Sequence, residues 1–220
     1  TMNFGKAFTY IFDDKRWFEK LLIPLLVLLI PFIGGLVIAG YLMRIIRNVA
    51  EHQAEPLPEL EFGADLRRGF KWLVGALVYS IPVMLISLVV FIPLVNSINS
   101  GRHSVFATLF ALLAGLILFF YIIALVFIMP AALANVAMKD SISAAFEFKE
   151  IFRLLKNNFK AWLIVLGGNL VCSLFAPLGS IIIIVGALIT ALFSQLVIAH
   201  LTGQAYAHSQ TEGGQGALPY

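Results

Sequence analysis

A long apolar run over residues 20–47 constrains this chain more than any other stretch of its sequence. It reads KLLIPLLVLLIPFIGGLVIAGYLMRIIR and holds no charge between its first lysine and its two closing arginines. A straight helix of this length, rising about 1.5 Å per residue, can cross a hydrocarbon core of about 30 Å once. Pro31, Gly34 and Gly35 interrupt the run, and both residue types disfavour a helix interior. A break there predicts instead a re-entrant hairpin over 21–46, whose two half-helices enter the membrane and return to the same face.

Further apolar segments predict a polytopic membrane protein. The 220 residues are 60% hydrophobic and 12% charged, whereas soluble domains are about 45–50% apolar and about 25% charged. Four segments without acidic or basic residues predict transmembrane helices, at 72–95, 105–129, 161–176 and 181–201. We expect a single membrane domain over 1–206 and a polar C-terminal tail over 207–220.

Amphipathic segments precede the apolar hairpins three times. Phenylalanines recur at helical spacing within 3–19, which predicts an interfacial helix. The segments 62–71 and 142–159 also place phenylalanine on one side and basic residues on the other. We therefore predict an all-α integral membrane protein: a broken re-entrant helical hairpin followed by four transmembrane helices, with three interfacial amphipathic helices on the cytoplasmic side.

The lysines and arginines distinguish between the two arrangements of the long run, because short loops rich in these residues stay in the cytoplasm. A re-entrant hairpin puts 14 of the 15 basic residues on one side and only Arg102 on the other, whereas a single span divides them 10 against 5. The hairpin predicts a multi-pass protein of the cytoplasmic (inner) cell membrane with both termini in the cytoplasm. The single span stays open, because broken backbone exposed to lipid is costly unless protein covers it.

Residue types at the ends and on the faces of these segments predict anchoring and packing. Basic and aromatic residues anchor a protein at headgroup depth, and the candidates are Lys15, Arg16, Trp17, Lys20, Trp72 and Trp162. Small residues let helices approach closely, and the candidates are Ala107, Ala111, Gly115, Gly167, Gly168, Ala187 and Ala191. The turn of the broken helix is assigned to Pro31, Gly34 and Gly35, and we expect other segments to shield its backbone.

Catalytic motifs are missing from the sequence. It contains no G-x-S-x-G, H-E-x-x-H, P-loop or dinucleotide fingerprint, and the apolar segments hold no Asp, Glu, Lys or Arg. We therefore expect no enzyme, and ion-coupled transport is disfavoured.

The lone Cys172 permits no intrachain disulfide. His200 is a candidate ligand for a porphyrin, chlorin or metal, although solvation or hydrogen bonding explains a lone interfacial histidine better. No cofactor is predicted, bound lipids are expected, and the basic residues flank spans rather than indicating nucleic acid.

Several segments together resemble a known family. They are YIFDDKRWFEKLLIP, IPFIGGLVIAGYLMRIIRNV with its glutamate-proline linker, FGADLRRGFKWLVGALVYSIPVML and SAAFEFKEIFRLLKNNFKAWL. In this order they resemble the prokaryotic polytopic membrane family called domain of unknown function 4013, up to about Tyr206. The resemblance implies a bacterial or archaeal membrane protein without an established activity, and it supplies no functional residues.

Three functional hypotheses follow. The first is a non-catalytic accessory or assembly subunit that packs against other membrane proteins of a larger complex and against lipids. The second is a small-solute channel or transporter built around the break at Phe32–Gly35, with a wet cavity lined by Tyr79, Tyr121 or Asn169. The third is a membrane-surface scaffold that acts through the amphipathic helices.

Overall fold

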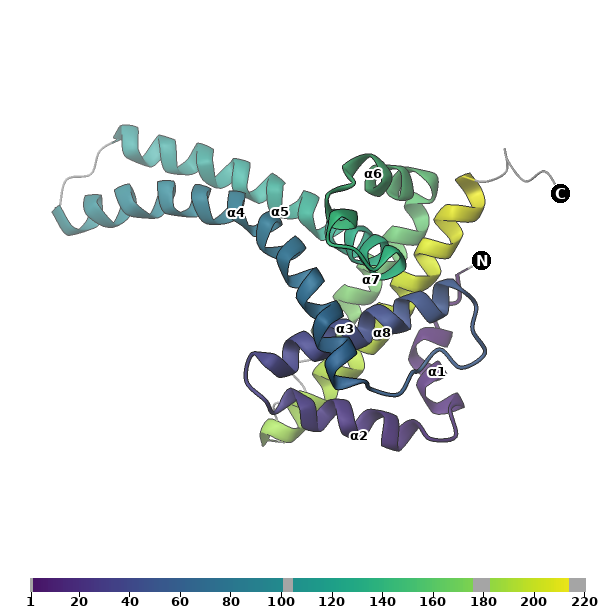
Figure 1. Ribbon diagram of the computed structural model, residues 1–220. Coiled ribbons are helices and arrows are strands. Elements are labelled where there is room, and N and C mark those ends of the chain that lie inside the picture. The colour runs from purple at the N-terminus through teal and green to yellow at the C-terminus, as the bar shows by residue number, and fades with distance from the viewer. Residues whose placement is uncertain (1, 101–104, 176–182, 214–220) are drawn as a thin grey trace.

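The computed structural model describes residues 2–100, 105–175 and 183–213, and these ranges contain helices and no strands (Figure 1). The helices are α1 (Lys6–Asp13), α2 (Trp17–Leu28), α3 (Ile33–Ala50), α4 (Phe62–Ser100), α5 (Val105–Lys139), the 3-10 turn η1 (Ser143–Phe146), α6 (Phe148–Asn157), α7 (Phe159–Phe175) and α8 (Ile183–Gly213). Four of them, α3, α4, α5 and α8, are long and apolar enough to cross a membrane. The prediction of an all-helical membrane protein is confirmed at this level.

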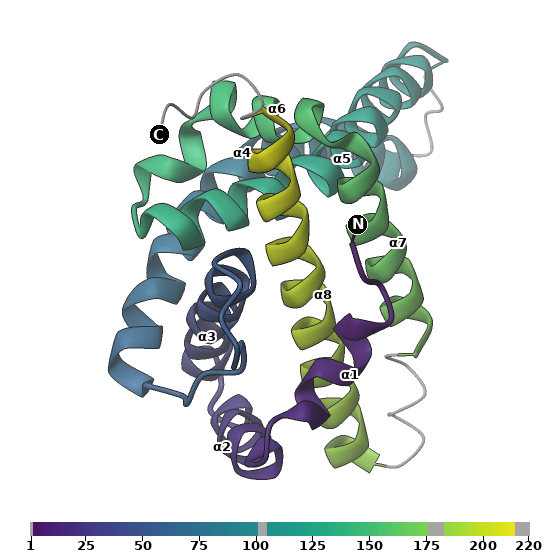
Figure 2. The same ribbon diagram turned by 90° about the vertical axis from the view of Figure 1, so that its right-hand side faces the viewer.

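Helices that follow one another in the chain pack against each other: α2 with α3, α3 with α4, α4 with α5, and α7 with α8. Figure 1 shows the α4–α5 pair projecting from the body as an arm, while the other pairs lie within the body. Figure 2 shows α1 lying across α8. The side of the membrane on which each pair begins stays a prediction.

The long apolar run is broken as the sequence indicates. α2 ends at Leu28, and α3 begins at Ile33. Phe32 lies between them with a φ of 61°, a left-handed conformation that is uncommon for a bulky residue, and its side chain is 93% exposed. We expected other segments to shield the backbone of this turn, but its backbone N–H groups find their acceptors within the turn itself. Ile30 donates to the Val27 carbonyl at 3.0 Å and Gly34 to the Ile30 carbonyl at 2.9 Å, so the turn satisfies them locally.

Two helices continue beyond the predicted spans. The amphipathic segment 62–71 and the span 72–95 form one helix, α4, that continues to Ser100. The second span, expected to end before Pro130, continues through this proline to Lys139 in α5. Prolines are tolerated within membrane helices where neighbouring elements compensate for the lost hydrogen bond. Ala131 and Ala132, which follow the proline, are fully buried.

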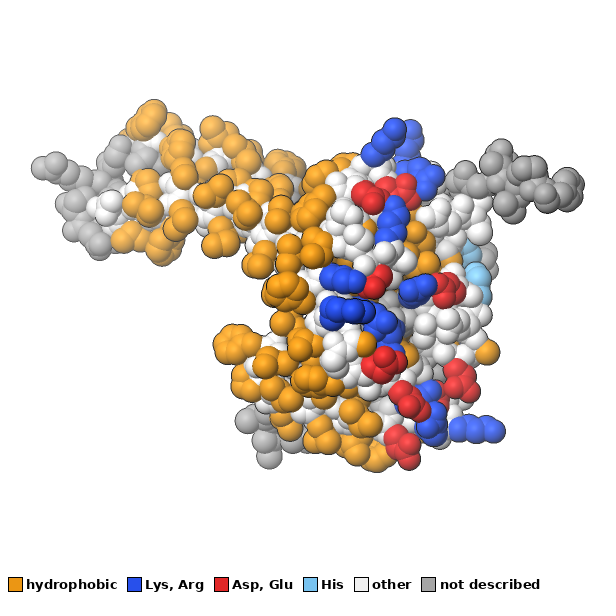
Figure 3. Space-filling model, in the orientation of Figure 1, with side chains coloured by type: hydrophobic (Ala, Val, Ile, Leu, Met, Phe, Trp, Pro, Cys, Tyr) orange, Lys and Arg blue, Asp and Glu red, His pale blue; other side chains and the backbone are white. Residues whose placement is uncertain are grey.

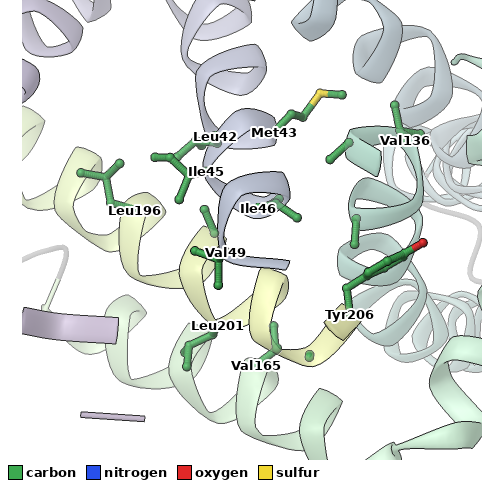
Figure 4. Packing of buried hydrophobic residues seen from close by; sticks show 14 of the residues in the cluster. Leu42, Met43, Ile45, Ile46, Val49, Val136, Val165, Leu196, Leu201 and Tyr206 are labelled. Carbon is green, nitrogen blue, oxygen red and sulfur yellow. The ribbon is translucent and has the colours of Figure 1, made fainter. Parts of the chain in front are cut away.

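The core is organised around α3, which packs against α4, α5 and α8. Figure 4 shows Ile45 and Ile46 of α3 between Leu201 of α8 and Val136 of α5. All four side chains are fully buried.

Two glycines permit the crossing of α3 and α4. A Cβ added at Gly40 would lie 1.8 Å from the Asp65 carbonyl oxygen, and one added at Gly69 would lie 1.8 Å from the Leu36 carbonyl oxygen. Each helix therefore presents a glycine to the backbone of the other. Any larger residue at either position would force the two backbones apart.

Candidate interaction surface

The α4–α5 arm is the largest apolar surface that the described part of the chain leaves uncovered. The most apolar windows of α4 and α5 are each only 6% buried, whereas those of α3 and α8 are 56% and 50% buried. Its exposed side chains are large and aliphatic or aromatic, among them Leu88, Leu112 and Phe120. Figure 3 shows this arm almost free of charge, while lysines, arginines and acids gather on the body.

The predicted small-residue stripe on α5 is half-buried at Ala111 and Gly115. A Cβ added at Gly115 would meet nothing within 4 Å. The side chain of Ala107 lies outside the described residues. Ala114, which was not predicted, is instead the buried small residue of this part of the helix. The surface around Gly115 is therefore open to another helix.

Of the other predicted packing residues, one is in close contact with a neighbouring helix and the others are not. A Cβ at Gly168 would lie 2.3 Å from Leu201 Cδ1, so this glycine lets α7 approach α8. Gly167 has open space around its missing Cβ. Ala187 is half-buried and Ala191 is exposed.

The two glycines assigned to the turn, Gly34 and Gly35, also differ in how closely other atoms approach them. A Cβ at Gly34 would lie 2.2 Å from the Val27 carbonyl oxygen, so Gly34 is where α3 leaves α2 in close contact. Gly35 faces open space, and Pro31 is exposed in the turn between the two helices.

A buried ion cluster fixes the base of the arm. The Asp65 carboxylate is fully buried and accepts hydrogen bonds from Arg44 Nη2 at 2.7 Å and from the Glu61 amide at 2.8 Å. Arg68 Nη1 lies 3.3 Å from its other oxygen. A buried carboxylate is stable only when it is paired and hydrogen-bonded in this way. The sequence pattern missed the cluster, because these residues were interpreted as parts of a solvated linker and a basic surface.

A second cluster holds the start of α2. Lys20 is 6% exposed, and its Nζ lies 2.5 Å from Asp14 Oδ2 and donates to the Leu57 carbonyl at 2.8 Å. Burial alone would raise the pKa of Asp14, but hydrogen bonds from Lys20 and from the Arg16 amide outweigh it and lower that pKa. The assignment of Lys20 as a membrane anchor is therefore wrong, because its charge is neutralised inside the molecule.

The two ends of the long apolar run meet the same linker. Lys20, before the run, donates to the carbonyl of Leu57, and Arg44, at its end, donates to the carbonyl of Glu59. Those two linker residues are only two positions apart, so their Cα atoms are at most about 7–8 Å from each other. The start of α2 and the latter part of α3 therefore lie at one end of the hairpin.

Of the remaining anchor candidates, Lys15, Arg16 and Trp17 are exposed and Trp72 is half-buried. Trp162 is buried, and its Nε1 donates to the Leu154 carbonyl and to Ser209 Oγ, both at 3.0 Å. Trp162 therefore lies inside the body, just after the 93° bend between α6 and α7, and not at an exposed position. Ser209 lies in α8, so the first part of the predicted tail is helical and packed.

His200 joins α1 to α8. It is buried, its ring stacks on that of Tyr10 at 4.3 Å, and its Nδ1 lies 2.9 Å from Gln204 Nε2. Tyr10 in turn donates to the Leu196 carbonyl at 3.2 Å. Within the described residues, no three His, Cys, Asp or Glu side chains gather as a metal site. The histidine thus has hydrogen-bonding and stacking partners from the chain itself.

The polar side chains expected to line a transport path make other contacts. Tyr121 donates to the Tyr79 carbonyl at 2.9 Å, and the Tyr79 hydroxyl donates to the Ala145 carbonyl. These bonds tie α5 to α4 and α4 to η1. Asn169 is exposed on α7.

Comparisons with known proteins give a family and one distant relative. A family model described as a protein of unknown function (DUF4013) matches residues 23–185, a shorter range than the resemblance up to Tyr206 suggested. The "Uncharacterized protein MJ1189" of Methanocaldococcus jannaschii is 29% identical over 164 residues, which cover 70% of this chain and 53% of the relative. The chain thus spans about half the length of that protein. No solved structure matches the chain.

Proposed function

This chain belongs to the DUF4013 family of proteins of unknown function, and we propose that it is a non-catalytic accessory subunit that packs its α4–α5 arm against transmembrane helices of another protein. The observation that carries the proposal is the 6% burial of the arm beside the 50–56% burial of the other long apolar helices. Large exposed apolar surfaces mark interaction with a membrane or with another protein.

Lipid alone accounts for the exposed leucines and phenylalanines of the arm, but not for its open small-residue surface. Helices associate in membranes where small residues let their backbones approach. Gly115, with nothing within 4 Å of its missing Cβ, offers such a place on α5. The occupant that fits it is a transmembrane helix of a partner, because a lipid chain gains little from a glycine at this position.

The attachment of the arm supports a docking role. Lys71 Nζ lies 2.8 Å from Asp140 Oδ1, and the Tyr79 hydroxyl bonds to the Ala145 carbonyl, so α4 is joined at two points to the segment that follows α5. The cluster around Asp65 holds the beginning of α4 against α3. An arm fixed in this way loses less conformational freedom on binding.

The proposal includes the re-entrant arrangement of the first hairpin. Lys20 and Arg44 bond to linker carbonyls two residues apart, whereas a single span would separate the ends of the run by about 30 Å. With this hairpin returning to its own side, the positive-inside rule puts both termini in the cytoplasm. A cysteine introduced at position 6 should then resist a membrane-impermeant thiol reagent added from outside, and labelling from outside would overturn this topology.

The test of the accessory role is the protein mass of the complex extracted from native membranes in mild detergent. We expect a mass greater than that of one chain, which Gly115→Leu reduces to that of a single chain. Gly167→Leu makes the same substitution on α7, away from the arm, where an added Cβ also meets nothing within 4 Å, and serves as the matched control, with no change expected. A wild-type mass equal to one chain, or a complex made only of copies of this chain, would refute the proposal.

A further inference from the structure

A second apolar feature lies on the other side of the body from the arm, and the packing role does not involve it. A cavity of about 410 Å³ lies between α1, α2, α7 and α8. Its walls include Trp17, Leu21 and Leu25 from the first hairpin and Leu192 and Phe193 from α8. Its volume lies in the range of about 300–1,000 Å³ that is typical of small-molecule sites.

The walls of the cavity favour a hydrocarbon ligand. Only two of the lining residues, Thr190 and Ser194, carry a polar side chain, and both hydroxyls have partners within the chain. Thr190 donates to the Gly186 carbonyl at 3.0 Å, and Ser194 hydrogen-bonds with the Cys172 thiol. A polar ligand would lose its hydration here without replacement hydrogen bonds, which costs several kcal/mol.

The surroundings of the cavity identify the kind of hydrocarbon. Phe12, Phe18 and Ile189 line it and are at the same time half or more exposed, so the cavity opens onto an apolar outer surface. In a protein with membrane-spanning helices, that surface faces lipid chains. Trp17, which also lines the cavity and is exposed, is of the residue type enriched at the membrane–water interface.

A basic side chain, Lys15, precedes Trp17 of the cavity wall by two residues and itself borders a separate cavity with Asp13 and Asp14. Lys15 is exposed and forms no ion pair within the described residues, although the other charges of the α1–α2 junction are paired. Asp13 pairs with Lys6, Asp14 with Lys20, and Arg16 with Glu59. The Lys15 ammonium group, two residues before Trp17 in the sequence, is therefore available to an anionic group.

We propose that this cavity binds one acyl chain of a membrane phospholipid, with the lipid phosphate at Lys15. The apolar walls take the chain, and the lysine contributes a charge-assisted contact to the phosphate. The site is separate from the α4–α5 arm, so its test and the test of the packing role have independent outcomes.

The experiment uses the full-length protein in detergent with a small proportion of phosphatidylcholine that carries a photoactivatable diazirine near the end of one acyl chain. After illumination, peptide mass spectrometry locates the label. We expect saturable labelling concentrated in 17–25 and 189–194, at least five-fold above the exposed α4–α5 arm. Even labelling of all exposed apolar surfaces would overturn the proposal, and this comparison needs no variant.

Matched substitutions test the chain and the headgroup separately. Leu22→Trp fills the cavity and should reduce its labelling at least five-fold, whereas Leu26→Trp, one turn further along α2 and outside the lining, should not. Lys15→Gln should weaken labelling at low lipid, while Lys149→Gln, an exposed lysine on α6, should leave it unchanged. Labelling that persists in Leu22→Trp overturns the acyl-chain site, and labelling indifferent to Lys15→Gln overturns the phosphate contact.

Discussion

The crossing of α3 and α4 gives the sharpest prediction, which is that Gly40→Ala destabilises the protein although alanine is the better helix former. The added Cβ would lie 1.8 Å from the Asp65 carbonyl oxygen. Ordinary contact begins at 3.4 Å, so the two backbones must separate by about 1.6 Å. A backbone carbonyl within a helix cannot rotate aside as the end of a flexible side chain can.

The expected magnitude follows from two opposing effects. Overpacking a well-packed interior costs about 1–3 kcal/mol and occasionally more, and contact with backbone puts this site at the upper end. Replacing glycine by alanine within a helix returns about 1 kcal/mol. The net loss is about 2 kcal/mol or more, which for a chain of this size lowers the melting temperature by about 4–8 °C.

The measurement is thermal unfolding of the purified protein in one detergent, followed by near-UV circular dichroism or size-exclusion chromatography after heating. Gly35→Ala on α3 and Gly63→Ala on α4 are the matched controls, because neither added Cβ has an atom within 4 Å. Both should leave the melting temperature unchanged or raise it slightly. Equal melting temperatures for Gly40→Ala and Gly35→Ala would refute the close crossing.

Three further changes test the buried polar contacts. Asp65→Asn should cost about 3–5 kcal/mol, because it leaves buried arginine charge without its counter-ion, whereas Glu61→Gln, at an exposed partner, should cost at most about 1 kcal/mol in the same melting assay. Because folding lowers the pKa of Asp14, its contribution to stability is present above the ordinary pKa of 3.8 and is lost as the pH falls through the lower folded pKa. Asp14→Asn should therefore flatten the acid side of a profile of melting temperature against pH. An unchanged profile would contradict the pairing with Lys20. Trp162→Phe, which removes an indole N–H with two buried acceptors, should cost about 1–3 kcal/mol, and an unaltered melting temperature would show that those bonds contribute nothing.

The apolar runs and their interruptions were sufficient to predict the helices and the position of the break. The break could be predicted because proline and paired glycines act locally on the backbone. The contact that each glycine makes could not be predicted from the sequence. Gly34 and Gly35 are neighbours in an identical context, yet one lies against the Val27 carbonyl and the other faces open space.

Charge patterns predicted sides of the membrane but indicated none of the ion-pair partners. Asp65 is separated from Arg44 by 21 positions, and only the folded linker brings them together. Lys20 has the surroundings of an anchor in the sequence, but the Asp14 carboxylate and a linker carbonyl bury it. Long-range pairing of this kind has no periodicity, so no local pattern could have predicted it.

The central position of α3 has a consequence for how the protein is made. Its Ile46 carbonyl lies 2.6 Å from where a Cβ of Gly203 would be, so α3 and α8 meet closely although about 157 residues separate these two positions. Ribosomes add about 5–20 residues per second, so α3 waits about 8–30 s for α8 to emerge. During that interval the face of α3 that α8 later covers stands open in the bilayer, and α1 has no helix to lie across. The body of this protein therefore closes only after α8 has been made, and an insertion factor that occupies that face in the meantime would have to leave before folding is complete.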